Sequence, residues 1–207
     1  MTSKNPPMEF LRGPRVVLCP LRKEDSPQFA RWMNDAETAN FLMFHRPLSL
    51  EEEEEWVNKA LHMPITEGAI LGIWLHSPFR LVGSIGLHSL HSRDRHATLG
   101  ISIGEANLRG KRLGREAMSL LIDYAFRTLN LRRVILWCYG HNERAIRCYR
   151  AVGFQEAGRL ERHSFINGEW QDYVLMEITP DRLKPLVAEE KPARRKPAPK
   201  TPAAKAK

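Results

Sequence analysis

Seven consecutive residues in the middle of the chain combine small size with fixed positive charge. They lie between an apolar stretch and a run with helical spacing. Glycine lets a ligand approach the main chain closely, and the first N–H groups of a helix have no partner within the helix. Together with arginine and lysine they form a site for an anion, and we predict a phosphate group there. The residues are Arg109, Gly110, Lys111, Arg112, Leu113, Gly114 and Arg115.

Two common phosphate-binding motifs do not account for this turn. A Walker A loop has four residues between its first glycine and the Gly-Lys pair, followed by Ser or Thr. Here five residues separate Gly104 from Gly110, and Arg112 stands at the position of the hydroxyl. The dinucleotide fingerprint G-x-G-x-x-G is also absent from the sequence. An ordinary strand-to-helix turn with solvated cations is the alternative interpretation.

The neighbouring segments predict the elements that would hold this turn. Leu99, Ile101 and Ile103 alternate with smaller residues, which is typical of a half-buried strand. Residues 133–138 form a nearly continuous apolar run, which indicates a strand covered on both faces. Strand, helix and strand in this order predict a right-handed crossover and a parallel pair. The apolar positions of the helix are Met118, Leu121, Ile122, Ala125, Phe126 and Leu129.

A second polar motif follows at residues 141–154. Asn142 can cap a short helix that places Ala145, Ile146 and Tyr149 on one face, and Gly153 suits the left-handed position that ends it.

With both motifs in this order and spacing, the chain resembles the GNAT superfamily of acetyl-CoA-dependent N-acetyltransferases, in particular its RimJ/RimL-type branch. The resemblance covers residues 14–178 and implies one α/β domain, a central mixed β-sheet flanked by helices. Two departures stand out. Arg112 replaces the first glycine of the family loop, which is tolerable if its φ is negative, and Thr98 stands where relatives often have Glu.

The resemblance also implies roles for individual residues. The main-chain N–H groups of Ile101, Ser102 and Ile103 would bind the pantetheine arm and the developing oxyanion. Residues 109–115 would hold the pyrophosphate, and Asn142 the pantetheine arm. Tyr149 would be the general acid for the thiolate, with a core aromatic as the alternative. For the general base the candidates are His88, Glu105 and His163, or an ordered water chain.

The acceptor is an amine. The RimJ/RimL resemblance favours the α-amino group of a protein or peptide, with ribosomal proteins as the type substrates. A polyamine, an aminoglycoside or an amino-acid-like amine is the alternative, because one fold serves several acceptors. Two other classes stay open: a CoA-binding module without catalysis, and an RNA-associated protein that acts through its tail.

The positive charge is concentrated at the C-terminus. The formal net charge is +8, of which residues 191–207 contribute +7 and residues 1–190 only +1. Residues 181–207 are rich in Pro, Ala and Lys, so we predict a disordered tail. It would solubilise the protein or make weak contact with RNA or the ribosome surface.

The cysteine content and the lack of long apolar stretches indicate the cellular compartment. Three widely spaced cysteines without a C-x-x-C pair indicate a reducing compartment, and neither a leader nor a membrane-spanning stretch is evident. We therefore expect a cytoplasmic monomer or homodimer that makes no membrane contact. His88, His91 and His96 match no zinc pattern, so we expect no metal.

Elsewhere the patterns predict a strand at 16–19, a helix from Ser26 and a helix capped by Ser49 and Glu52. Glu51–Glu55 would form a solvated first turn or attract a cationic substrate. The apolar run 41–44 would be core or border the acceptor site. Strands at 70–75 and 81–88 would pair, and Asn167-Gly168 would close a hairpin.

Overall fold

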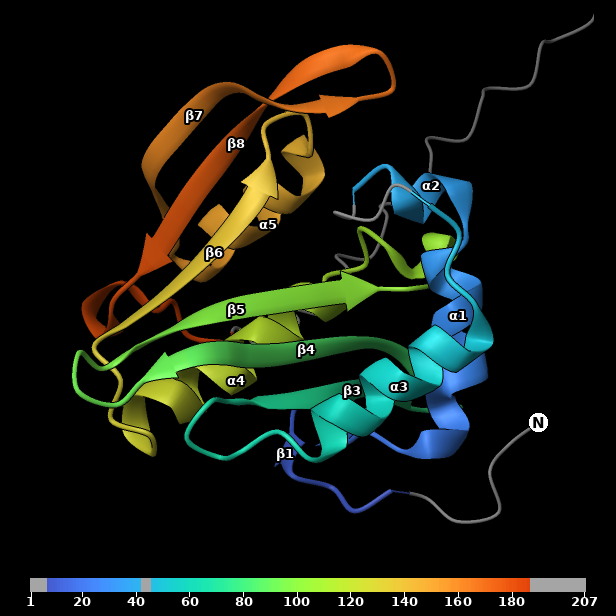
Figure 1. Ribbon diagram of the computed structural model, residues 1–207. Helices are drawn as coiled ribbons and strands as arrows, with labels where there is room; N and C mark the ends of the chain where they lie inside the picture. The colour runs from blue at the N-terminus through green and yellow to red at the C-terminus, as the bar shows by residue number, and fades with distance from the viewer. Residues whose placement is uncertain (1–6, 42–45, 187–207) are drawn as a thin grey trace, which may run out of the picture.

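A computed structural model describes residues 7–41 and 46–186. One sheet of eight strands runs through the domain in the order β1-β2-β3-β4-β5-β6-β8-β7. All neighbours pair antiparallel except β5 and β6, which are parallel. The predicted α/β fold with a mixed sheet flanked by helices is confirmed (Figure 1). The strands are β1 (Leu11–Arg12), β2 (Val16–Pro20), β3 (Ala69–His76), β4 (Phe79–His91), β5 (His96–Ile103), β6 (Arg133–Tyr139), β7 (Gln155–Ile166) and β8 (Glu169–Ile178).

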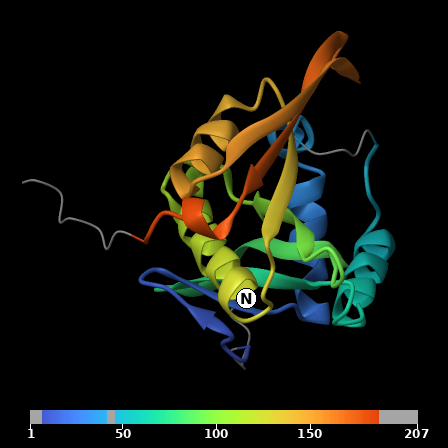
Figure 2. The same ribbon diagram turned by 90° about the vertical axis from the view of Figure 1, so that its left-hand side faces the viewer.

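Helices cover both faces of the sheet. Helices α4 and α5 pack on one face, and α1 and α3 pack on the other face, over its first half (Figure 2). Three short 3₁₀ turns complete the described part of the chain: η1 (Lys23–Asp25), η2 (Ala106–Leu108) and η3 (Pro180–Arg182). The α-helices are α1 (Ser26–Met33), α2 (Ala36–Ala39), α3 (Leu50–Leu61), α4 (Leu113–Arg127) and α5 (Glu143–Val152).

The core forms two layers, one on each face. The larger layer joins alternate residues of the central strands to the apolar stripe of α4, including Met118 and Ile122, which are 1% and 0% exposed. The smaller layer packs Phe29 and Trp32 of α1 and Val57 of α3 against β2 and β3. Alternation along β5 therefore sends Leu99, Ile101 and Ile103 toward α4, as the sequence predicts.

Local signals in the sequence set several element ends. Ser49 and Glu52 form the predicted capping box at the start of α3. Asn167 and Gly168 have φ values of 50° and 86° and close the β7–β8 hairpin, as an Asn-Gly turn requires. The interpretation of Glu51–Glu55 as a wholly solvated turn was wrong for Glu53, which is 4% exposed, and burial raises its pKa.

The folded part of the chain extends a few residues past the predicted boundary. Pro180–Arg182 forms η3, Leu183 packs against the core, and the Lys184 N–H donates to the Val152 carbonyl at 3.0 Å. Residues 181–184 are thus part of the domain rather than of a tail. The predicted tail beyond them falls on residues 187–207, outside the described part, as do Leu42–Phe44 of the apolar run. Across residues 7–41 and 46–186, the helices are too short or too polar to cross a bilayer.

Candidate active site

The central parallel pair of strands separates soon after it forms. β5 and β6 share only three register pairs, ending at Thr98 and Ile135, although β5 continues to Ile103 and β6 to Tyr139. Beyond this point each strand pairs only on its outer side, and the two diverge (Figure 1). We call this divergence the β5–β6 split. It leaves main-chain hydrogen-bonding groups of β5 without a strand partner.

The pairing pattern decides which of these groups face the split. Gly104 N–H donates to Val82 O of β4 at 2.9 Å. Main-chain groups of successive residues point to opposite edges of a strand, so those of Ser102 also face β4. The main-chain groups of Ile101 and Ile103 face the split instead. The sequence predicts main-chain donors at Ile101, Ser102 and Ile103. The prediction for Ser102 is wrong, because its main-chain groups already pair with β4.

The cationic turn lies beyond the end of β5 and leads into α4. Gly110 has φ 75° and Arg112, the N-cap residue of α4, has φ 64°. A side chain at this position is tolerable with a negative φ, and that condition is not met: Arg112 lies in the left-handed region that glycine favours. Lys111 and Arg112 are exposed, and the first intrahelical bond is from Glu116 N–H to Arg112 O. The N–H groups of Leu113, Gly114 and Arg115 thus face the turn without helical acceptors.

Arg109 has a different role from the one the sequence predicts. Its side chain is 7% exposed, and its guanidinium donates to Glu37 and Thr38 of α2 at 2.9 and 2.5 Å. It also donates to the carbonyls of Ile103 and Gly104, both at 3.0 Å. These four bonds use the guanidinium within the protein. The assignment of its side chain to the pyrophosphate is therefore corrected, and Arg109 fixes α2 to the end of β5.

A buried ion pair that sequence reasoning missed supports the turn from below. Glu116, 4% exposed in the first turn of α4, accepts from the main-chain N–H groups of Arg15 and Val16 at 2.6 and 3.0 Å. The Arg15 side chain donates to Glu116 at 3.0 Å and to the Lys111 carbonyl at 3.1 Å. Glu116 is a single carboxylate next to the apolar positions of α4, and this was the signal in the sequence. Its partner, Arg15, is about a hundred residues away.

Tyr149 lies on α5, half-buried, beside the thiols of Cys138 and Cys148. Burial strongly raises its pKa, and the neighbouring thiols add to the shift. Its ring lies 6.0 Å from that of Phe154, centroid to centroid. The raised pKa keeps the phenol protonated at neutral pH, and among the described residues its hydroxyl forms no hydrogen bond.

Asn142 caps α5, as the sequence predicts. Its side-chain oxygen accepts from Ala145 N–H at 3.2 Å, which leaves the amide N–H groups of the side chain to face other partners. Gly153 ends the helix with φ 127°, and a Cβ there would lie 2.0 Å from the Arg182 carbonyl. This position requires glycine.

The three candidate bases lie in different surroundings. His88 of β4 pairs in register with Thr98, and its Nε2 would lie 3.7 Å from a Cβ at Gly100, so it belongs to the β4–β5 surface beside the split. The side chain is exposed at the surface, and partial desolvation by the neighbouring atoms lowers the pKa of its imidazole. Glu105 is bound in an ion pair with Arg80. His163 lies on β7, exposed, with its ring stacked 5.5 Å from that of Tyr173.

Aromatic rings line the sheet on the far side of the split. Trp137 of β6 stacks against Tyr173 of β8 with ring centroids 4.9 Å apart, and Tyr139 of β6 lies tilted against the same ring at 5.5 Å. His141 stacks on both Tyr139 and Phe41, each at 5.6 Å. We call these five residues the aromatic row. Alternation along β6 could have predicted which of its residues share a face with Trp137. The nearly continuous apolar run 133–138 gave no polar residues to mark that face.

The geometry fits a CoA thioester. An extended pantetheine arm needs main-chain partners, and the split side of β5 has main-chain groups that could serve. A pyrophosphate needs donors such as those at the start of α4. The described residues therefore fit this cosubstrate.

Comparisons with known proteins agree with this geometry. Residues 15–155 match the family model of the acetyltransferase (GNAT) domain. The spermidine N(1)-acetyltransferase of Vibrio cholerae is 29% identical over 152 residues, which cover 73% of this chain and 86% of the relative. A crystal structure of the spermidine N-acetyltransferase from Vibrio cholerae, in complex with CoA and spermine, superposes with a TM-score of 0.73 at 27% identity. It covers 82% of this chain and 98% of that one.

A shorter match runs to the [ribosomal protein uS5]-alanine N-acetyltransferase of Escherichia coli. It is 36% identical over 81 residues, 39% of this chain and 41% of the relative. The family is set by the longer matches: the chain belongs to the GNAT acetyltransferases and is an acetyl-CoA-dependent N-acetyltransferase.

Proposed function

We propose that this enzyme acetylates a primary amine of a small polycation of the polyamine class. The β5–β6 split is the observation that supports the proposal, because it leaves main-chain groups of β5 without a strand partner, and the turn before α4 follows the end of that strand. Acetyl-CoA, when bound, supplies an acetyl group activated as a thioester. The steps below concern what the protein's own residues do.

The first task is to hold the cosubstrate extended along β5. Ile101 would donate and accept main-chain hydrogen bonds on the split side of β5, and Ile103 would donate its N–H, since its carbonyl already accepts from Arg109. A donor preorganised there also stabilises negative charge that develops on the acyl oxygen. Asn142, with its side-chain oxygen used by the α5 cap, would donate its amide N–H groups to the arm from the other side.

The phosphate end would rest on the turn before α4. The free N–H groups of Leu113, Gly114 and Arg115 point into the turn, and the helix dipole adds partial positive charge. Lys111 and Arg112, both exposed, would contribute full charges. Gly110, with its positive φ, shapes the turn for close approach.

Tyr149 would donate its phenolic hydrogen to the departing sulfur. Its raised pKa keeps the proton in place until charge develops on the sulfur. A thiol has a pKa of about 8.5, so the sulfur leaves as a thiolate that the hydrogen bond stabilises. General acids in this position contribute on the order of 10²–10⁴-fold to rate.

His88 would accept the proton of the attacking ammonium, directly or through water. The lowered pKa keeps the imidazole neutral at pH 7, which a base requires. His88 also lies on the β4–β5 surface beside the split. Glu105 is less suited, because its carboxylate is held by Arg80.

Two observations favour a polycation as the acceptor. Similarity to the spermidine N-acetyltransferase extends over most of both chains. The aromatic row also offers ring faces beside the split, and a cation over such a face gains about 0.5–2 kcal/mol. Trp137 is 38% exposed and therefore accessible to an ammonium group.

An α-amino group of a protein or peptide is the second candidate, in keeping with the RimJ/RimL-type resemblance. The 36% identity to the uS5-alanine N-acetyltransferase supports it over a shorter stretch. The two acceptors differ in how many ammonium groups they bring to the aromatic row.

The two candidates are separated by acetyl-transfer assays on the full chain. Thiol release from acetyl-CoA is measured with spermidine, spermine and a peptide that begins with alanine, and mass spectrometry locates the acetyl group. We expect kcat/KM for a polyamine to exceed that for the peptide at least tenfold. The reverse order would establish the α-amine function, and no thiol release with any amine would indicate a CoA-binding module.

A further inference from the structure

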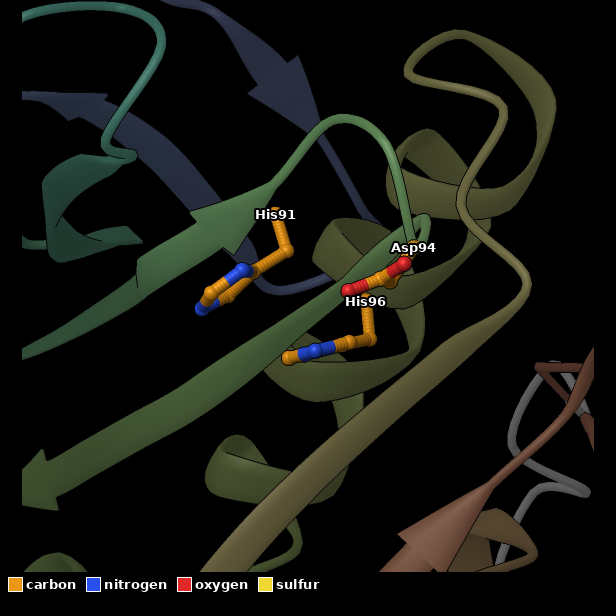
Figure 3. Close-up of side chains that lie close together, drawn as sticks. All are labelled: His91, Asp94 and His96. Atoms are coloured by element: carbon orange, nitrogen blue, oxygen red, sulfur yellow. The ribbon is translucent and has the colours of Figure 1, made fainter.

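The end of the β4–β5 hairpin brings together three side chains that have metal-binding donor atoms. His91 and His96 are paired in register across the hairpin, and Asp94 lies in the turn between them. One donor atom from each lies within 4.8 Å of the others. The two imidazole rings stack with centroids 4.4 Å apart at 25° (Figure 3). Sequence spacing did not predict a metal here, because the hairpin, rather than a helix, makes the histidines neighbours.

The donor atoms lack partners within the described part of the chain. His96 Nδ1 is buried, and no described residue forms a hydrogen bond with it. A buried polar atom without a partner is destabilising, and a neutral imidazole nitrogen is the commonest metal ligand in proteins. The Asp94 carboxylate forms no ion pair with any described residue, so its negative charge is available to a cation.

Arg95 holds the turn that carries these residues in place. Arg95, at φ 57°, donates from its main chain to the His91 carbonyl at 2.6 Å. Its guanidinium donates to the carbonyl and side chain of Asn130, at 2.8 and 2.6 Å. This cation is therefore committed to the loop before β6 rather than to Asp94. A fixed turn lowers the entropy cost of assembling ligands.

We propose that His91, Asp94 and His96 form a binding site for a divalent transition ion of the Zn²⁺ class. Two imidazole nitrogens and one carboxylate oxygen are donors that Zn²⁺ prefers, and three protein ligands leave one position for water. The ion has no role in acetyl transfer. It joins the two strands of the hairpin where β5 pairs with β6 at His96 and Arg133, just before the split.

The test is calorimetric titration of the untagged full chain with ZnCl₂ at pH 7.5, with MgCl₂ as the comparison ion. We expect one Zn²⁺ per chain with micromolar affinity and no comparable Mg²⁺ binding. His91→Ala and His96→Ala each weaken Zn²⁺ binding at least tenfold, and Asp94→Asn at least threefold. The matched control is His62→Ala, an exposed histidine on another element, bonded to the Asn58 carbonyl. It leaves binding unchanged.

A second measurement identifies the ligands independently. Co²⁺ bound to nitrogen and oxygen donors gives a visible spectrum without thiolate charge transfer. The proposal is overturned if a thiolate band appears, if His62→Ala and His91→Ala behave alike, or if affinity is only millimolar. Melting of each variant without metal verifies that it is folded.

Discussion

The main-chain N–H of Arg15 lies 2.6 Å from Oε1 of Glu116, and the same arginine donates from its side chain to the Lys111 carbonyl. One buried carboxylate therefore ties β2, the first turn of α4 and the cationic turn into a single unit. The turn for which we propose phosphate binding is thus positioned by a carboxylate below it.

Glu116→Ala should destabilise the domain strongly. It removes the acceptor of the buried Val16 N–H, of the half-buried Arg15 N–H and of one Arg15 side-chain bond, which costs about 3 kcal/mol. Urea unfolding measures the loss. Glu116→Gln keeps one acceptor oxygen and should lose less. The control is Glu143→Ala, whose exposed pair with Arg147 should matter by less than about 0.5 kcal/mol. Equal losses at the two positions would contradict this account.

Arg112→Gly should stabilise the protein and weaken cosubstrate binding at once. The left-handed φ of 64° costs a side chain about 1 kcal/mol that glycine does not lose. Removing the cation should raise KM for acetyl-CoA several-fold. Arg112→Ala removes the charge and keeps the strain, so it should raise KM without stabilising. Thermal melting and steady-state kinetics separate the two effects, and a destabilised Arg112→Gly would refute the strain argument.

Tyr149→Phe tests the general acid with little disturbance of packing. The hydroxyl makes no hydrogen bond among the described residues, so its loss should leave the melting temperature nearly unchanged. We expect kcat to fall at least tenfold, while acetyl-CoA affinity holds. A kcat within twofold of the wild type would mean that Tyr149 only packs against the core.

His88 should set the acidic limb of the pH–rate profile. The imidazole accepts a proton only when neutral, and partial desolvation lowers its pKa below the usual value of about 6.5. Activity should therefore persist below pH 6.5 and fall only as the pH drops through the lowered pKa. His88→Gln should reduce kcat/KM by about 10²-fold and abolish this limb. His163→Gln is the matched control and should keep the wild-type profile.

Two truncations should define the C-terminal boundary. Removing residues 187–207 should leave the melting temperature within about 1 °C. Removing everything after Thr179 also deletes η3 and the bonds of Lys184 to Val152 and Arg150, and uncovers Gly153. A loss of about 2 kcal/mol there corresponds to roughly 4–8 °C. Equal melting of the two truncated chains would show that η3 contributes nothing.

Local rules predicted most of the fold. The capping box at Ser49 and Glu52, the Asn167-Gly168 turn and the alternation of Leu99, Ile101 and Ile103 each specify a few consecutive residues. Such signals depend on hydrogen bonds and side-chain periods within one element, so the sequence contains them directly. The family resemblance added the central mixed sheet flanked by helices.

The site was less predictable, because its details depend on contacts between distant segments. Arg109 and Arg112 look alike in the sequence, yet one is buried against Glu37 and Thr38 and the other is exposed at positive φ. Whether the main-chain groups of Ser102 face β4 or the split depends on how β5 pairs with β4, which the sequence does not state. The nearness of His91 to His96 likewise depends on where the hairpin turns.

The β5–β6 split also bears on how long the protein survives. An eight-stranded sheet that opens in its middle exposes an inner edge, and an amide-bearing cosubstrate lying there would act as a partial strand. A ligand that binds only the folded state stabilises it in proportion to its concentration. Resistance of the chain to proteolysis would then rise and fall with the supply of acetyl-CoA, and the abundance of the enzyme would follow the metabolic state that its own substrate reports.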